Sequence, residues 1–238
     1  MIAPPAAARG VAERLGAWIA DQRVRRVVFS YVPEETPTAE AISHVLAAAG
    51  YRLSLARLVS SPRLDLPDTF EAYVQSLTKK DRHELRRKIR RLETGRRVSF
   101  RFAGDAERGA VLDRFIALHR RSRGEKALFM NAARERFFRD AADALAAKGW
   151  LRLGALAVDG SVAAVLYAWA YEGGLALYNA AYAPELASLS IGIVSHAYAV
   201  REAIASGLRE YDLLRGDEPY KYDLGGQDRW LVRIEASR

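Results

Sequence analysis

Two glycine-containing turns constrain the fold of this chain more than any other feature of its sequence. Residues 151–158, 163–171 and 175–182 are apolar or alternate in polarity as β-strands do, and Asp159-Gly160 and Gly173-Gly174 separate them. Such dipeptides are strong signals for two-residue hairpins, because these turns require positive φ angles. The last third of the chain is therefore predicted to contain an antiparallel meander of three strands.

A helix and further strands follow the predicted meander. Residues 190–206 have a helical pattern that ends at Gly207, and residues 209–214 and 229–235 are predicted strands joined by a loop at 215–226. A meander followed by a helix and another strand indicates a mixed α/β (α+β) layer with the helix packed on the sheet. The elements expected before the meander are helices at 11–21, 38–49, 69–93 (interrupted near Thr78), 107–123 and 132–148, and strands at 25–32, 51–60 and 97–102.

Composition excludes several classes of protein. Half of the 238 residues are hydrophobic, enough for one good core or two small ones, and there is no cysteine for a disulfide scaffold, a thiolate zinc site or a cysteine nucleophile. The four histidines are far apart in the sequence, so no metal site is predicted, and the glycine motifs of P-loop, Rossmann and serine-hydrolase proteins are absent. Residues 1–10 contain no apolar core for a signal peptide, and Asp159-Gly160 interrupts the longest apolar stretch, 153–171, so that no membrane span is predicted. We expect a cytoplasmic protein.

The net charge of +8 is concentrated in one segment. Residues 79–97 contain ten basic and three acidic residues, and the remaining 219 residues contain 27 basic and 26 acidic ones. Leu85, Ile89 and Leu92 form a narrow apolar stripe along the helix predicted there. The basic face can be a solvated surface, a surface for an anionic substrate, or a nucleic-acid site, although interleaved aromatic residues are missing.

Two further segments carry candidate chemistry. Residues 188–192, Ser-Leu-Ser-Ile-Gly, open a helix directly after a strand, where a serine cap and free N–H groups favour a phosphate. An ordinary capped helix with a packing glycine is the simpler explanation of the same residues. Residues 211–221 gather acidic, basic and tyrosine side chains at the exit from a strand. They could position an amine or transfer protons, or simply close the loop with salt bridges.

Three motifs together resemble a known family. They are Leu-Thr-Lys-Lys-Asp-Arg-His-Glu-Leu-Arg-Arg-Lys at 77–88, Phe-x-x-Leu-His-Arg at 115–120 and Asp-Leu-Leu-Arg-Gly-Asp-Glu-Pro-Tyr-Lys at 212–221. The chain resembles the CelD-type acetyltransferase-like domain of the GNAT superfamily, which is related to the Fem-type aminoacyl transferases. The resemblance covers about residues 68–234. It implies a GNAT-like acyl-CoA N-acyltransferase fold at 68–238 and a partial or degenerate first GNAT-like lobe at 1–67.

The resemblance also implies an activity and a site. Strands at 175–182 and 210–214 would splay apart around an acyl-coenzyme A such as acetyl-CoA, and an amine would attack its thioester with Tyr220 as the acid and Tyr222 in reserve. The acceptor would be a small molecule or an anionic envelope or polysaccharide precursor. The residues implied for the site are Tyr220, Asp217 and Glu218 in catalysis, Ser188, Leu189, Ser190, Ile191, Gly192 and Ile193 in donor binding, and Tyr178, Asn179, Asp212, Arg215, Lys221, Arg86 and Arg90 in substrate binding.

The chain departs from the superfamily at its pyrophosphate signature. Ala187, Ser190 and Gly192 align with three signature positions, and only Gly192 matches. A Fem-like transferase that uses aminoacyl-tRNA, for which the basic helix would be useful, therefore remains open, as does a catalytically silent interaction domain. The length differs as well, because members usually carry about a hundred residues ahead of the matched region, which makes this chain either a short form or an incomplete one.

Overall fold

The computed structural model of the chain describes residues 5–122 and 128–238, which fall into two compact units. The smaller unit comprises the chain up to Pro62 together with residues 215–217 and 228–238. The larger unit comprises residues 63–214 and 218–227. Each unit has its own sheet and its own hydrophobic core.

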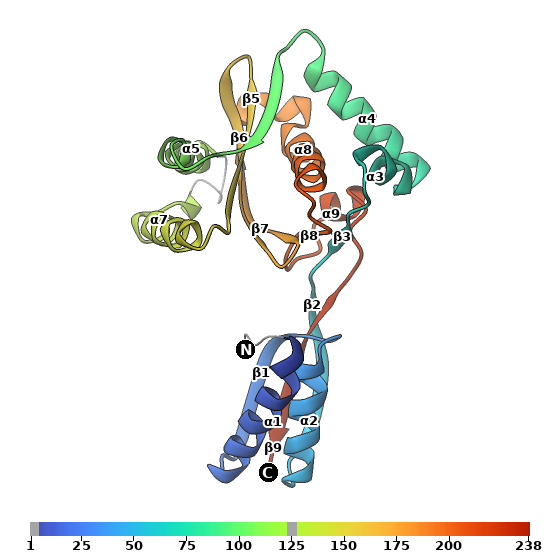
Figure 1. Cartoon of the computed structure of the whole chain (residues 1–238), viewed down its shortest axis with the longest axis vertical. Coiled ribbons are helices and arrows are strands. Elements are labelled where there is room, and N and C mark those ends of the chain that lie inside the picture. Colours follow the sequence, from blue (N-terminus) through green and yellow to red (C-terminus); the bar gives the residue numbers. More distant parts are fainter. Residues whose placement is uncertain (1–4, 123–127) are drawn as a thin grey trace. The chain divides into compact units, whose positions relative to one another are not determined.

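The larger unit is built on a six-stranded sheet of order β3-β8-β7-β6-β5-β4 (Figure 1). Its strands are β3 (Arg63–Asp65), β4 (Val98–Phe102), β5 (Leu151–Val158), β6 (Ser161–Tyr171), β7 (Gly174–Tyr182) and β8 (Glu210–Asp212). All neighbouring pairs are antiparallel except β7 and β8, which are parallel. The predicted meander is confirmed as β5, β6 and β7, and β3 is a short strand that the sequence pattern does not indicate.

The hairpin turns explain why the meander folds locally. Asp159 and Gly160 both have positive φ angles, as the predicted turn requires. The second turn uses Glu172 and Gly173, with φ angles of 46° and 81°, so it lies one residue earlier than the predicted Gly173-Gly174 pair. Gly174 instead begins β7, opposite Tyr171.

Helices cover both faces of this sheet. They are α3 (Phe70–Ser76), α4 (Lys79–Glu93), α5 (Arg108–Arg120), α7 (Ala132–Ala147), the 3₁₀ helix η1 (Pro184–Leu189), α8 (Ile191–Ala205) and α9 (Pro219–Asp223). On one face Tyr167 of β6 packs against Phe115 of α5 and Phe138 of α7. On the other face Leu166 of β6 shares a core with Val200 of α8. The strands are thus enclosed between α5 and α7 on one side and α8 on the other (Figure 1).

The predicted interruption near Thr78 separates α3 from α4. Leu77 is extended, with ψ 155°, and Thr78 begins the new helix with its hydroxyl accepting a hydrogen bond from the Asp81 N–H at 3.2 Å. This is the N-cap arrangement that threonine favours. The basic segment is therefore an independent helix, whose Leu85 and Leu92 are buried.

Strands β7 and β8 diverge soon after they meet. They pair only at Gly174–Glu210, Leu175–Tyr211 and Ala176–Asp212, whereas β7 continues to Tyr182. Beyond Ala176, no strand in the described part of the chain pairs with this edge of β7. The expected splay between the two strands is present, although β8 ends at Asp212 rather than at Leu214.

The smaller unit is a three-stranded sheet of order β1-β9-β2 with two helices. Its elements are α1 (Pro5–Asp21), β1 (Arg26–Pro33), α2 (Pro37–Ala48), β2 (Arg52–Ser60) and β9 (Trp230–Ser237). Ile42 and Leu46 of α2 are buried with Ala236 of β9. The expected domain at 68–238 is corrected here, because the last strand lies between β1 and β2, where it buries Val232, Ile234 and Ala236. That the unit is a partial GNAT-like lobe stays a prediction.

None of the helices in residues 5–122 and 128–238 combines the length and the apolarity that crossing a bilayer requires.

Candidate functional site

Three aromatic side chains meet in the larger unit where β7 and β8 begin to diverge. Tyr211 of β8 is opposite Leu175 and is fully buried. Its hydroxyl lies 3.0 Å from Nδ1 of His196, a buried residue in the second turn of α8. The His196 imidazole stacks on the ring of Tyr220 in α9, with 5.2 Å between the ring centroids and 18° between the planes. The predicted acid Tyr220 therefore belongs to a packed aromatic cluster at the splay.

Burial sets the protonation of this cluster. Loss of solvation, and secondarily the positive charge of Lys221, lowers the pKa of His196 to about 4, so the imidazole is neutral near pH 7. Burial also raises the pKa of Tyr220 to about 12 and that of Tyr211 well above its usual value. Tyr220 thus keeps its proton throughout the physiological range and can donate it in a hydrogen bond.

The loop between β8 and α9 is closed by a buried lysine. Lys221 is 2% exposed, and its Nζ donates a hydrogen bond to the Leu214 carbonyl at 2.9 Å and lies 3.0 Å from the Glu218 carboxylate. Leu214 has a φ of 54°, and its N–H donates to Oδ1 of Asp212 at 2.7 Å. The contacts of Lys221, Glu218 and Asp212 thus hold the loop that presents Tyr220, as the salt-bridge interpretation expected. Roles in substrate binding or catalysis remain predictions for all three.

Two of the predicted site residues belong to the smaller unit. Arg215 places its guanidinium over the ring of Tyr31, 5.3 Å from the centroid, and Asp217 is exposed. Tyr222, the reserve acid, is 37% exposed on α9 in the larger unit. The acidic and basic residues of the 211–221 motif therefore do not form one cluster within a single unit, and the parts assigned to Asp217 and Arg215 stay predictions.

The turn into α8 differs from the predicted capped start. Ser188 and Leu189 end η1, and Ser190 adopts the left-handed conformation with φ 57° and ψ 32°. The prediction of a Ser190 side-chain cap is wrong, because its hydroxyl accepts no hydrogen bond from the helix. Capping hydroxyls reach the helix from an extended backbone, which Ser190 does not have.

The first turn of α8 nevertheless offers backbone donors. The Val194 N–H donates to the Ser190 carbonyl at 3.0 Å and begins the helical ladder. The N–H groups that precede this ladder, at the positive end of the helix dipole, belong to Ile191, Gly192 and Ile193. A Cβ on Gly192 would lie 3.3 Å from Cε1 of Tyr182, so this glycine also permits close packing of α8 on β7. Gly192 can therefore both allow close packing of α8 on β7 and leave its N–H group available to a phosphate.

A recess of about 240 Å³ lies beside this first turn. It is lined by Ile193 of α8 and by residues of α4 and α9 that carry both charges: Lys80, Lys88, Asp81, Glu84 and Asp223, together with Leu85. Two ammonium groups and three carboxylates leave no positive excess in the recess. Any phosphate bound here would therefore depend on the helix N–H groups more than on net charge.

Tyr178 and Asn179 lie on the face of the sheet opposite to α8. The register of β6 and β7 shifts between Tyr167–Asn179 and Ala168–Leu177, which makes Tyr178 the extra residue of a β-bulge. Tyr178 packs on Phe138 of α7, and Asn179 Oδ1 is 2.8 Å from Nε2 of the buried His119 on α5. The bulge turns two consecutive side chains of the splayed strand toward α5 and α7.

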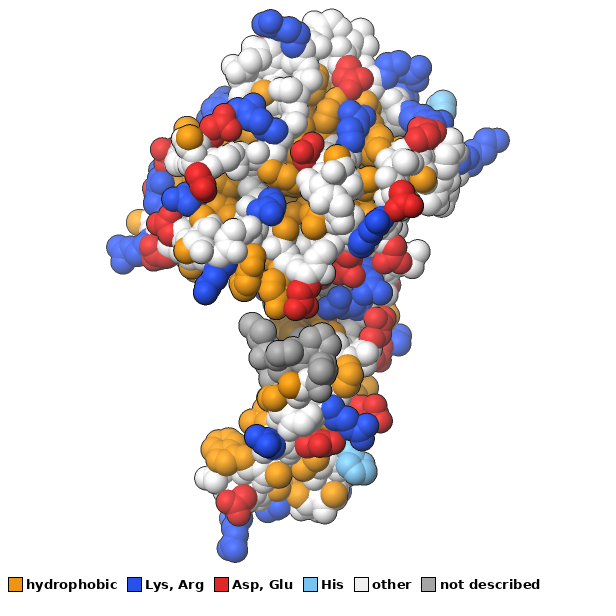
Figure 2. All heavy atoms as spheres, in the orientation of Figure 1, with side chains coloured by type: hydrophobic (Ala, Val, Ile, Leu, Met, Phe, Trp, Pro, Cys, Tyr) orange, Lys and Arg blue, Asp and Glu red, His pale blue; other side chains and the backbone are white. Residues whose placement is uncertain are grey.

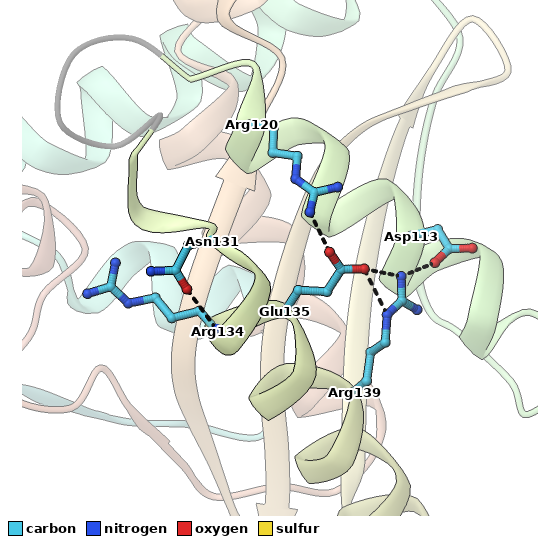
Figure 3. A network of polar contacts seen from close by, with 6 residues as sticks. All are labelled: Asp113, Arg120, Asn131, Arg134, Glu135 and Arg139. Atoms are coloured by element: carbon cyan, nitrogen blue, oxygen red, sulfur yellow. Dashed lines mark hydrogen bonds and ion pairs between the residues drawn. The ribbon is translucent and has the colours of Figure 1, made fainter.

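Ion pairs join the two helices on that face (Figure 3). Glu135 of α7 accepts hydrogen bonds from Arg139 at 2.8 Å and from Arg120 of α5, and Arg139 also pairs with Asp113 of α5 at 2.7 Å. Hydrogen bonding to Arg139 first, and to Arg120 as well, lowers the pKa of Glu135. These contacts join α5 to α7 beside the Asn179–His119 pair, on the face of the sheet opposite to α8.

Some of the basic side chains of α4 are paired with carboxylates, and others are exposed to solvent. Arg86 pairs with Glu71 of α3 at 2.5 Å, and Arg87 pairs with Glu84 at 2.7 Å. Arg90 is exposed, and a shallow surface on the first half of the helix is lined by Lys79, Lys80, Arg82, His83, Glu84 and Arg86. Basic side chains project along the edge of the larger unit formed by α4 (Figure 2). The substrate-binding parts predicted for Arg86 and Arg90 remain predictions, and for Arg86 the pairing with Glu71 must first be broken.

Sequence reasoning missed His196 and Tyr73 as parts of the site, and it included Tyr211 only as the first residue of the 211–221 motif, without a role. Tyr73 of α3 donates a hydrogen bond from its hydroxyl to the Leu224 carbonyl at 2.8 Å, at the end of α9. The available signal for His196 is a single imidazole within the apolar run of 191–200. A buried polar residue in such a run needs a partner, which here is Tyr211.

A family model described as an acetyltransferase (GNAT) domain matches residues 79–222. A conserved protein of unknown function from Bacteroides thetaiotaomicron VPI-5482 aligns with 97% of this chain and 75% of its own, with a TM-score of 0.69 and 12% identity. FemX aligns over 95% and 77%, with a TM-score of 0.67 and 10% identity. L-PGS from Bacillus licheniformis aligns over 93% and 70%, with a TM-score of 0.56 and 15% identity.

No match is found among curated proteins. At such low identities the structural likeness concerns the fold alone, and together with the family model it confirms the mixed α/β, GNAT-like fold expected from the sequence.

Proposed function

Because the chain belongs to the acetyltransferase (GNAT) domain family, we propose that it transfers an acyl group from an acyl-coenzyme A to the nitrogen of an amine. The observation that carries the proposal is the divergence of β7 and β8 after three paired residues, with Tyr220 at the point of divergence. An extended thioester would enter this gap, and the first turn of α8 would receive its pyrophosphate.

The chemistry requires few groups from the protein. The neutral amine attacks the thioester carbonyl, the new C–N bond forms, and the C–S bond breaks as the sulfur leaves as thiolate. Backbone N–H groups on the unpaired edge of β7 would stabilise the oxyanion. Tyr220, which keeps its proton at neutral pH, would donate it to the departing sulfur, and the proton that the nitrogen loses after its attack would return to the Tyr220 phenolate, directly or through water.

The two faces of the sheet suggest separate approaches for the two substrates. Ile193 and Tyr220 lie on the α8 side, and Asn179 faces α5 on the other side. We propose that the donor enters from the α8 side and the amine reaches the splay past Asn179. An anionic envelope or polysaccharide precursor, modified in the cytoplasm, is the acceptor suggested by the CelD-type resemblance.

Calorimetric titration with acetyl-CoA tests the donor. We expect saturable binding that Gly192→Leu abolishes, because its side chain would enter the packing against Tyr182 and obstruct the first turn of α8. Gly109→Leu is the matched control, since a Cβ on Gly109 meets no atom within 4 Å. Absence of binding of acetyl-CoA and longer acyl-CoAs at millimolar concentration would exclude this donor class.

A Fem-like transfer from aminoacyl-tRNA is the second candidate. The basic surface of α4 and the poor match of Ala187 and Ser190 to the pyrophosphate signature favour it. It predicts tRNA binding that weakens steeply with salt. Lys79→Ala with Lys80→Ala should reduce this binding, whereas Arg87→Ala should affect it less, because Arg87 is paired with Glu84.

A catalytically silent interaction domain is the third candidate. It predicts that Asp217→Ala and Tyr220→Phe change at most the stability of the protein. Turnover of any acyl donor that is lost in Tyr220→Phe at unchanged stability would exclude it.

A further inference from the structure

His196 is a buried titratable side chain at the splay to which the proposed chemistry assigns no part. It is 4% exposed in the second turn of α8, and the Tyr211 hydroxyl lies 3.0 Å from its Nδ1. Its flat face lies against Tyr220 at 18° between the ring planes. One imidazole thus connects β8 through Tyr211, α8 through its own backbone, and α9 through Tyr220.

Each contact restricts a different motion. The hydrogen bond to Tyr211 fixes the plane of the imidazole, because the buried hydroxyl has no solvent to turn to. The stacked ring then limits rotation of Tyr220 about its χ angles, and such aromatic pairs contribute beyond the area that they bury. Tyr220 is the only member of the three that is half-buried, so it is the one in need of support.

We infer that His196 is a positioning residue for Tyr220: fixed by Tyr211, its imidazole holds the Tyr220 phenol in the orientation that faces the splay. This inference rests on the proposed function for its effect on turnover. The placement of the Tyr220 ring itself can be measured whether or not the protein transfers an acyl group.

The competing explanation is that His196 only satisfies the buried Tyr211 hydroxyl. Two variants separate the explanations. His196→Asn keeps a polar atom near the position of Nδ1 and removes the stacked ring, whereas His196→Phe keeps a flat ring and removes the hydrogen bond. Positioning by stacking predicts that the Asn variant loses about tenfold in kcat with little change in KM, and that the Phe variant stays within about threefold. The competing explanation predicts the reverse order.

The decisive measurement is NMR of protein labelled with 13C in its tyrosine rings. The Tyr220 signals are assigned by their loss in Tyr220→Phe. We expect them to carry a ring-current shift that disappears in His196→Asn and persists in His196→Phe. Unchanged Tyr220 signals in His196→Asn would overturn the inference regardless of activity. Full activity of Tyr220→Phe would instead overturn the proposed acid and leave this measurement valid.

Tyr211→Phe provides a second route if His196→Asn does not fold. It removes the hydroxyl that fixes the imidazole and leaves both stacked rings in place. We expect broadened or partly shifted Tyr220 signals and a smaller fall in kcat than in His196→Asn. Sharp, unshifted signals in this variant would overturn the part of the inference in which Tyr211 fixes the imidazole.

Discussion

The ammonium of Lys221 donates a hydrogen bond to the carbonyl of Leu214 across a distance of 2.9 Å, and so ties α9 to the loop that follows β8. The two residues lie seven positions apart, and Lys221 is almost fully buried. Leu214 has a positive φ, a conformation that costs free energy for a side chain of this size. The loop that presents Tyr220 therefore depends on a contact that the lysine makes with the backbone.

Lys221→Met should lower the free energy of unfolding of the larger unit by about 1–3 kcal/mol, because the partly buried Leu214 carbonyl loses the hydrogen bond from the charged ammonium. Urea unfolding followed by tryptophan fluorescence measures this change. Glu218→Gln, which alters only the 57% exposed partner of the same ammonium, should cost less than about 1 kcal/mol. Equal effects of the two changes would contradict the assignment of the main contact to Leu214.

Tyr220→Phe should reduce kcat by about 10²-fold without loss of stability, because it removes the proton donor and keeps the ring that stacks on His196. Tyr222→Phe is the matched control two residues away, on the exposed side of α9, and should leave kcat within about twofold. Steady-state kinetics with an acyl-CoA and an amine acceptor measure both variants. A larger fall in Tyr222→Phe would transfer the acid to that residue.

Acid should destabilise the larger unit through His196. Its pKa is about 4 in the folded protein and about 6.5 when unfolded, so between these values the unfolded chain binds a proton that the folded chain does not. The stability contribution is complete above pH 6.5 and falls by about 3 kcal/mol as the pH approaches 4. Unfolding midpoints from pH 7 to pH 4 measure it, and the difference from His196→Phe isolates this residue from the carboxylates. Parallel curves for the two proteins would refute the assignment.

Gly225→Ala should destabilise the end of α9 by about 1–3 kcal/mol. Gly225 has a φ of 87°, and a Cβ there would lie 2.6 Å from Cδ2 of Leu77. Gly104→Ala is the control, since Gly104 has neither a positive φ nor a neighbouring atom within 4 Å of the added carbon. Thermal unfolding of the two variants measures the difference, and similar midpoints would show that Leu77 can move aside without cost.

Local patterns predicted most elements because their causes are local. The turns at Asp159 and Gly173 need positive φ, and Thr78 supplies a hydroxyl for the helix that follows it. The prediction of a Ser190 cap had the correct residue type but not the backbone conformation, which η1 sets by ending immediately before Ser190. Residue types therefore indicated reliably where elements begin and end. They were a poorer guide to the hydrogen bonds that cap those ends.

The candidate site was predicted only in its outline. The motif at 211–221 contained Tyr220 and Lys221, and the structure gives Tyr220 a neighbour from outside the motif, His196 of α8, and gives Lys221 a backbone partner within it, Leu214. The bulge at Tyr178 depends on the register of β6 against β7, which no single strand contains. Side-chain partners of this kind arise only when separate elements pack.

The sequence by itself determined the meander, the helix that follows it and the concentration of positive charge on α4, because hairpin turns, helical periodicity and charge are properties of neighbouring residues. Only the tertiary structure decided that β9 joins β1 and β2, that β7 and β8 part after Ala176, and that His196 supports Tyr220. A strand with one buried face can pair with any edge that completes a core, so its partner is chosen by packing across the whole chain.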